Sequence, residues 1–394
     1  MKFVWVEKDK KIDRVLNEEM KVYVKWSLEP DEDYAKLSRH YINAGYIALK
    51  EVIEGSHNNN SKYDTWFLPG VYMLRHAIEL LIKAGLASKG TTKKELQKIF
   101  FAEKHNVVGL YKTYKDKSGV IELKESEQEW IEKYLESIEV VDSNSDLFRY
   151  PFKDAFLQQY ADKSLDIYHM SNRLIFCYST LHKVIYGEWF NEVKLNLAEE
   201  PEFLKLASSA IHNCCLWDSP WSNGFYKQVI GYRRVAEFLF TQFKESKDEA
   251  LFYPIVFLMR NAIEIGLKRL LHINMDQSID EKIIRRKRNS HLLYKDLWKS
   301  IKPMLVHYAQ EDHQNEETLD LAESYIISLD CLDKQGNIFR YPCSYSNEYK
   351  FNDKVIDVAN FYNYLLELFN FIDSCDTWLN NIKDIEMEMK SQGE

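Results

Sequence analysis

The chain has 394 residues, a formal net charge of −9 and six cysteines. The acidic balance excludes a protein that coats polyanions in general, but it leaves room for a locally basic site. The length suits two units of about 195 residues, each large enough for its own core. The cysteines form no CxxC pair, which is typical of reduced thiols in a cytoplasmic protein. We expect no membrane span, because no apolar run approaches roughly 20 residues.

The only β signal lies at the beginning of the chain. Residues 3–6 and 21–26 are short runs rich in β-branched and aromatic residues. They predict at most a small β-hairpin near the N-terminus, ahead of an otherwise all-α chain.

A segment of the chain occurs twice. Residues 61–83 align without a gap with residues 246–268, and ten positions are identical. The register continues to Phe-Arg-Tyr-Pro turns at 148–151 and 339–342, while the offset grows only from 185 to 191 residues. One domain has therefore been duplicated, with a period too long for a solenoid.

Each copy is predicted to be an antiparallel bundle of about five helices, because its apolar residues recur at helical spacing. In the first copy the helices are expected over 41–53, from Pro69, from His105, over 126–138 and over 162–186; in the second copy they are expected over 226–243, from Pro254, from His291, over 317–329 and over 353–379. The boundary is expected near 187–201, where helical periodicity is lost. We therefore expect two domains, residues 1–195 and 196–394, arranged as a pseudo-twofold pair.

A charged triplet is repeated within the duplicated segment. Arg75, Glu79 and Lys83 lie four residues apart and share one helical face. The second copy repeats the triplet as Arg260, Glu264 and Lys268. Three interpretations stay open: a buried structural network, a functional site, or a solvated face. In the structural version Glu79 bridges Arg75 and Arg149 of the Phe-Arg-Tyr-Pro turn, because a buried carboxylate needs charged partners.

One histidine opens a predicted helix in each copy, His105 in the first and His291 in the second. Such a histidine can titrate near neutrality or donate a hydrogen bond to a phosphate, and it can also be a simple cap. The other histidines and the cysteines show no metal-ligand spacing, so we expect no metal and no cofactor. No GxGxxG, Walker loop, GxSxG or HExxH is present, which excludes a nucleotide-binding fold of the parallel-sheet type.

In their order, these motifs resemble those of the helical HEPN family (higher eukaryotes and prokaryotes nucleotide-binding). The matching positions are Leu74-Arg75, Ala77-Ile78-Glu79, Lys83, His105, Leu110-Tyr111 and Arg149-Tyr150-Pro151, with their equivalents in the second copy, including Arg340. The resemblance covers roughly residues 40–185 and 225–380. It implies antiparallel bundles that pair, with an RNA-cleaving or RNA-binding cleft where they meet.

The family's ribonuclease signature, an arginine followed after four to six residues by a histidine, is matched only in the second copy. There Arg285 and Arg286 precede His291, whereas the first copy offers Lys98 before His105. The resemblance implies that His291 acts as acid or base and that Arg285 or Arg286 stabilises the phosphorane charge. The basic run 282–288, which also contains Arg288, would guide phosphates.

Two classes of function stay open. The first is an RNA-targeting effector of the toxin or phage-defence type, and the second is a non-catalytic module that binds a nucleotide, an RNA or a partner protein from the same gene neighbourhood. The expected catalytic residues are His291, Arg286, Arg285 and His105, and the expected binding residues are Arg75, Glu79, Lys83, Arg149, Arg260, Glu264, Lys268, Arg340 and Arg288. The RNA-associated defence protein is preferred. The sequence leaves its substrate, trigger and oligomeric state open.

Overall fold

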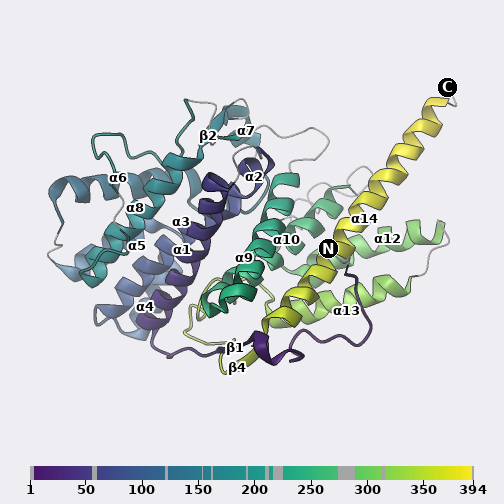
Figure 1. The fold of residues 1–394 in the computed structure, drawn as a ribbon, viewed down its shortest axis with the longest axis horizontal. Helices are drawn as coiled ribbons and strands as arrows, with labels where there is room; N and C mark the ends of the chain where they lie inside the picture. The colour runs from purple at the N-terminus through teal and green to yellow at the C-terminus, as the bar shows by residue number, and fades with distance from the viewer. Residues whose placement is uncertain are drawn as a thin grey trace. The chain divides into compact units, whose positions relative to one another are not determined.

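The computed structural model of the protein describes residues 4–55, 60–119, 123–152, 154–160, 163–191, 194–208, 213–215, 225–273, 289–311 and 316–392. Over these residues the chain is mostly helical, with two small two-stranded sheets (Figure 1). The predicted helical class is therefore confirmed. The duplication, the twofold relation and the division near residue 195 stay predictions.

The chain divides into two compact units that interleave along the sequence. The larger unit comprises Tyr23–Leu258 and Ile338–Lys354; the smaller unit comprises Met1–Val22, Met259–Asn337 and Val355–Glu394. The second Phe-Arg-Tyr-Pro turn therefore belongs to the larger unit, although the chain on both sides of it belongs to the smaller one.

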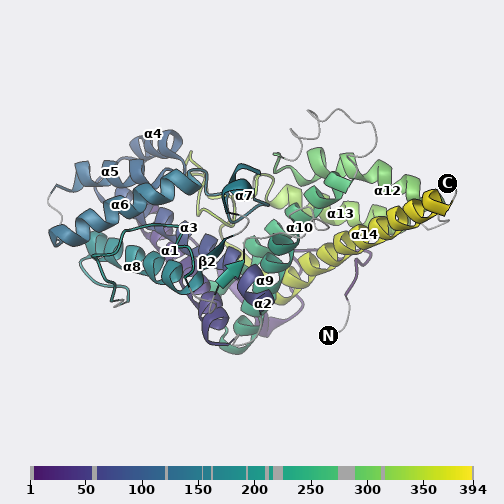
Figure 2. The same cartoon turned by 90° about the horizontal axis from the view of Figure 1, so that it is seen from above.

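Two long helices form the centre of the larger unit. α1 (Pro30–Glu54) packs along α3 (Phe67–Ser88), and nearly all of α3 is buried. The surrounding helices are α2 (Asn60–Thr65), α4 (Lys93–Glu103), α5 (Val107–Ser118), α6 (Glu125–Asp142), α7 (Asp154–Tyr160), α8 (Ile167–Tyr186) and α9 (Tyr226–Ser246), followed by η3 (Glu249–Leu251). α5, α8 and α9 all contact α3, and Figure 2 shows α4, α5 and α6 next to one another. Helix α3 is thus the core of this unit.

The smaller unit is built around the second half of α10 (Phe252–Ile273), which begins within the larger unit. Its other elements are η1 (Glu18–Met20), η5 (Leu293–Trp298), α12 (Lys299–Glu311), α13 (Glu317–Leu332) and α14 (Val358–Gln392). α13 contacts η5, α12 and α14. The N-terminal segment is fixed to the beginning of α14, because the Asn360 amide donates to the carbonyls of Lys11 (2.9 Å) and Arg14 (2.8 Å).

The predicted helices are present, but α1 begins at Pro30 rather than near 41, and the last helix of each copy begins later than expected. α8 begins at Ile167 rather than near 162, and α14 begins at Val358 rather than near 353. In both places an aspartate side chain caps the helix: Asp166 accepts from the backbone N–H of His169, and Asp357 accepts from that of Asn360. α14 also extends to Gln392, beyond the predicted end at 379, because no glycine or proline interrupts its helix-forming residues there.

The predicted N-terminal hairpin is wrong. Residues 21–24 do form a strand, β1 (Lys21–Val24), but it pairs with β4 (Lys354–Asp357) and not with residues 3–6. A second sheet joins β2 (Ser164–Asp166) antiparallel to β3 (Asn213–Cys215). β2 and β4 each lead directly into a capped helix. Strands of three or four residues are too short to show periodicity, and their partners are distant in sequence, so the pattern missed them.

One stretch is more apolar than the sequence analysis allowed. Residues Glu249–His272 are long and hydrophobic enough, by length and composition, to cross a membrane, with a mean hydropathy of 1.4. In the structure 94% of its most apolar 18-residue window is buried, and the stretch carries the charged triplet Arg260, Glu264 and Lys268. It has the character of a core helix, in which the charges of the triplet are paired inside the protein.

Candidate functional site

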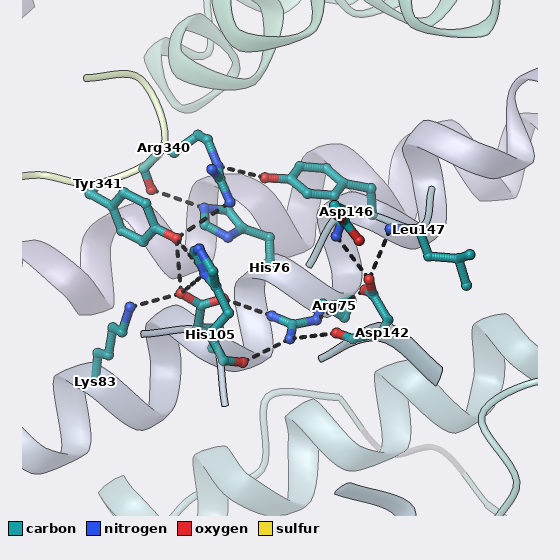
Figure 3. Close-up of polar contacts among 11 residues, drawn as sticks. Arg75, His76, Lys83, His105, Asp142, Asp146, Leu147, Arg340 and Tyr341 are labelled. Atoms are coloured by element: carbon teal, nitrogen blue, oxygen red, sulfur yellow. Dashed lines mark hydrogen bonds and ion pairs between the residues drawn. The ribbon is translucent and has the colours of Figure 1, made fainter. Parts of the chain in front are cut away.

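The charged triplet of the first copy lies inside the larger unit. Arg75, Glu79 and Lys83 share one face of α3, and each side chain is essentially inaccessible to solvent. The solvated-face interpretation is therefore wrong. We call Arg75, Glu79, Lys83, His105 and Asp142 the first cluster (Figure 3).

Glu79 is the centre of the first cluster. Its Oε2 accepts from the Arg75 guanidinium (2.7 Å), and its Oε1 accepts from Lys83 Nζ (2.7 Å). His105 Nδ1 lies 3.2 Å from both carboxylate oxygens. Burial alone would raise the pKa of Glu79, but Lys83, His105 and Arg75 outweigh it and hold the pKa well below its ordinary value. Glu79 is therefore an anion at neutral pH, fully enclosed by cationic and polar donors.

Arg75 connects three segments of the larger unit. Its guanidinium donates to the backbone carbonyls of His105 (2.9 Å) and Asp142 (3.3 Å), and its Nε lies 3.4 Å from Asp142 Oδ2. The other carboxylate oxygen of Asp142 accepts from the backbone N–H groups of Asp146 (2.8 Å) and Leu147 (2.9 Å). One arginine thus links α3, the beginning of α5 and the turn after α6.

Asp142 was missed by the sequence analysis. It lies six residues before Phe148 of the Phe-Arg-Tyr-Pro turn, and Asp333 lies six residues before Phe339. This repeated aspartate was the signal that could have identified it.

His105 is the member of the first cluster that reaches solvent. It lies two residues before α5, whose N-cap is Asn106, and 23% of its side chain is exposed. Burial lowers the pKa of His105, and Glu79 opposes this without cancelling it. Its Nδ1 is occupied by Glu79 and Tyr341, whereas its Nε2 makes no hydrogen bond with any residue that the structure describes. At neutral pH His105 is a neutral imidazole with one nitrogen available.

The second Phe-Arg-Tyr-Pro turn, not the first, closes over the first cluster. The Tyr341 hydroxyl donates to Glu79 Oε1 (2.9 Å) and lies 3.2 Å from His105 Nδ1. Arg340 Nε donates to the Tyr72 hydroxyl (2.8 Å). The predicted bridge from Glu79 to Arg149 is wrong, because the Arg149 guanidinium instead donates to the Tyr150 hydroxyl (2.9 Å). Sequence patterns could not show which copy's turn would reach this helix.

The triplet of the second copy makes the same contacts in the smaller unit. We call Arg260, Glu264, Lys268, His291 and Asp333 the second cluster. Glu264 accepts from Arg260 and from Lys268 Nζ (2.7 Å), and its Oε1 lies 2.8 Å from His291 Nδ1. Arg260 also donates to the carbonyl of His291 (3.0 Å) and lies 3.4 Å from Asp333 Oδ2. Burial would raise the pKa of Glu264, but Lys268, Arg260 and His291 hold it well below its ordinary value.

His291 is the more accessible of the two histidines, with 43% of its side chain exposed. It precedes η5, a short π-helical turn. The basic run 282–288, with Arg285, Arg286 and Arg288, lies outside the described residues. Whether either arginine approaches His291 therefore stays a prediction.

A separate cavity of about 840 Å³ opens in the larger unit. Its lining includes Lys25, Trp26, Lys36, Arg39, Tyr186 and Glu188, and none of its lining residues belongs to the first cluster. Arg39 is exposed and makes no ion pair with another residue in the described part of the chain. Lys36 Nζ lies over the Trp26 ring, 5.3 Å from its centroid. The cavity thus joins groups of both charges to aromatic surface, because Asp31, Glu32, Asp33 and Glu188 line it beside the three cationic residues.

No family model, curated protein or solved structure matches the chain. Within the described ranges, no group of three or more His, Cys, Asp or Glu side chains is placed to hold a metal ion. The chemistry available to the two clusters must therefore be judged from their own geometry, in which a partly exposed histidine contacts a buried carboxylate.

Proposed function

We propose that the protein is a HEPN-like, RNA-associated protein of two duplicated helical bundles, acting in the cytoplasm as a metal-independent ribonuclease of the toxin or phage-defence type. The observation that carries the proposal is the histidine–glutamate pair at each cluster. In both pairs Nδ1 of a partly exposed histidine contacts a fully buried glutamate. A carboxylate in this position orients the imidazole and stabilises its protonated form during proton transfer.

The two clusters also support the duplication. Each contains an arginine bound to the glutamate, to the carbonyl of the histidine and to an aspartate at the turn. In each cluster the triplet comes from one helix, the histidine from the segment before the next helix and the aspartate from the end of another helix. Common ancestry of the two copies explains this more simply than independent assembly of the same contacts.

The proposed reaction is cleavage of RNA by its own 2′-hydroxyl. The histidine takes the proton from the 2′-hydroxyl while the 2′-oxygen attacks the adjacent phosphorus. The bond from phosphorus to the 5′-oxygen then breaks, and the protonated histidine returns the proton to that oxygen. The products are a 2′,3′-cyclic phosphate and a 5′-hydroxyl. Arg285 or Arg286 would stabilise the charge on the phosphorane near His291.

The buried residues of the clusters have a supporting role in this proposal. Arg75, Glu79 and Lys83 are inaccessible to solvent, so an RNA phosphate cannot reach them without opening the bundle. We therefore assign direct contact with RNA to His105, His291 and the basic run 282–288. The expectation that the triplets bind RNA themselves is replaced by one in which they position the histidines.

The proposal is tested by incubating the purified protein with total cellular RNA in the presence of a chelator. Cleavage should persist in the chelator, and it should fall by at least about 100-fold in whichever of His105→Ala and His291→Ala removes the acting base. Tyr168→Phe, an exposed aromatic substitution outside both clusters, serves as the matched control. A folded wild-type protein that does not cleave RNA, or equal cleavage by wild type and both histidine variants, would refute catalysis.

The cavity of the larger unit favours a second candidate function, a non-catalytic module that binds a nucleotide or a partner protein. Arg39 and Lys36 could meet phosphate groups, and Tyr186 offers a ring for a base. Titration calorimetry with ATP and GTP tests this alternative. Binding that is weakened at least tenfold by Arg39→Ala supports it, and no heat of binding with either nucleotide removes the nucleotide version.

A further inference from the structure

We infer that Tyr341 is a positioning residue for His105, which it holds with a proton on Nδ1 so that Nε2 is the proton-accepting atom. The inference rests on the proposed function, because it concerns the same histidine. It adds that the first cluster is incomplete without a turn that lies more than 230 residues further along the chain.

The turn that carries Tyr341 is held at the two residues that precede it. The Tyr41 hydroxyl donates to the carbonyl of Phe339 (2.7 Å). His76 Nε2 lies 2.9 Å from the carbonyl of Arg340 and, as this carbonyl can only accept, carries the proton. These contacts come from α1 and α3, the two central helices of the larger unit. The position of the Tyr341 ring is therefore set by the core and not by the turn alone.

The ring itself is also enclosed. It is 8% exposed, the His76 ring meets it at a centroid distance of 5.3 Å, and Lys83 Nζ lies 4.7 Å from its centroid. Its hydroxyl is directed toward His105 (Figure 3) and also lies within hydrogen-bond distance of Glu79. The hydroxyl has little freedom to choose other partners.

The direction of each hydrogen bond follows from the chemistry of the three groups. Glu79 is a carboxylate and can only accept, so the Tyr341 hydroxyl donates its one proton to Glu79 Oε1. The Tyr341 oxygen then faces His105 Nδ1 as an acceptor. Both neighbours of Nδ1 are acceptors, so the proton of the neutral imidazole belongs on Nδ1. The lone pair is left on Nε2, which is the atom that can take a proton from RNA.

Tyr341 also weakens the electrostatic effect of the Glu79 carboxylate on His105. Glu79 Oε1 receives donors from Lys83 and Tyr341, and each donor reduces the negative charge that His105 experiences. The charged and titratable groups that face His105 are Glu79 and Lys83 from α3, and Arg340 and Tyr341 from the turn. Removing the hydroxyl of Tyr341 should strengthen the attraction between Glu79 and a protonated His105, raising the pKa of His105 by about 0.5 to 1 unit.

The test is nitrogen NMR of the full chain labelled with ¹⁵N-histidine, comparing wild type with Tyr341→Phe and assigning the signal with His105→Ala. The wild type should show His105 with its proton on Nδ1. The variant should show a raised His105 pKa. Tyr345→Phe is the matched control, because among the described residues Tyr345 lies near Lys83 but makes no hydrogen bond to Glu79 or His105, and it should leave the signal unchanged.

Two outcomes would overturn the inference: a wild-type His105 protonated on Nε2, or identical titrations in wild type and Tyr341→Phe. The first outcome needs no variant, so the inference stays testable if Tyr341→Phe does not fold. Failure of the proposed function is seen separately, as an absence of RNA cleavage by the wild type. If cleavage does occur, Tyr341→Phe should shift the acid limb of its pH profile upward by the same amount as the pKa.

Discussion

The first and second clusters share a set of contacts but differ in how they meet solvent. In both, a buried glutamate forms ion pairs with an arginine and a lysine of its own helix and contacts a histidine of the next segment. The histidine is 23% exposed in the first cluster and 43% exposed in the second. The arginine, glutamate and lysine are buried in both clusters, so the difference between the clusters lies at the histidine.

The largest expected effect is the loss of either glutamate. Glu79→Ala or Glu264→Ala leaves a buried arginine and a buried lysine without their common partner, and each should lower the free energy of unfolding by about 3 to 5 kcal/mol. Denaturant unfolding of the two variants measures this cost. Glu129→Ala, which removes an exposed carboxylate on α6, should cost under about 0.5 kcal/mol. Similar costs for Glu79→Ala and Glu129→Ala would contradict a structural role.

The next effect is the loss of stability at low pH, which should come mainly from histidines of the larger unit. Burial lowers the pKa of His40 to about 3 and also lowers the pKa values of His76 and His105, and all three residues belong to the larger unit. A histidine with a depressed pKa binds its proton more readily when unfolded, so stability is lost as the pH falls below 6.5 and continues to be lost until the folded pKa is reached. Over this pH range, each such histidine should lower the free energy of unfolding by about 1.4 kcal/mol for each pH unit.

This acid effect is measured by thermal unfolding between pH 7 and pH 4, with His40→Leu as the comparison. The variant removes one titrating group that is buried beside Lys36 and Arg39, so its unfolding free energy should depend less steeply on pH than that of the wild type. Equal slopes for the two proteins would show that His40 is not held neutral by burial. The depressed pKa values of Glu79 and Glu264 act in the same direction, but only below about pH 4.5.

A smaller effect compares one turn position in the two copies. Gly336 and Ser145 each lie three residues before their Phe-Arg-Tyr-Pro turn, and both have a left-handed backbone, with φ of 69° and 55°. A side chain at Gly336 would lie 2.9 Å from the guanidinium carbon of Arg260. Gly336→Ala should therefore cost about 1 to 2 kcal/mol, whereas Ser145→Gly should be neutral or stabilising by up to about 1 kcal/mol. Denaturant midpoints measure both, and a stabilised Gly336→Ala would contradict the assigned geometry.

The sequence predicted the helices and the triplets well because both leave local patterns. The spacing of Arg75, Glu79 and Lys83 fixes their common face on any helix, and the repetition of the triplet pointed away from a solvated surface. The sequence could not predict that Tyr341 would replace Arg149 at Glu79, because that contact depends on how distant segments pack. Strands β2, β3 and β4 were missed for the same reason, since each pairs with a remote partner over a few residues.

The most direct test of the central claim is to identify the ends of RNA fragments produced by the wild-type protein in the presence of a chelator. Attack by the 2′-hydroxyl, assisted by His105 or His291, predicts fragments ending in a 2′,3′-cyclic phosphate and beginning with a 5′-hydroxyl. Fragments with a 3′-hydroxyl and a 5′-phosphate, or RNA left intact by the folded protein, would contradict it.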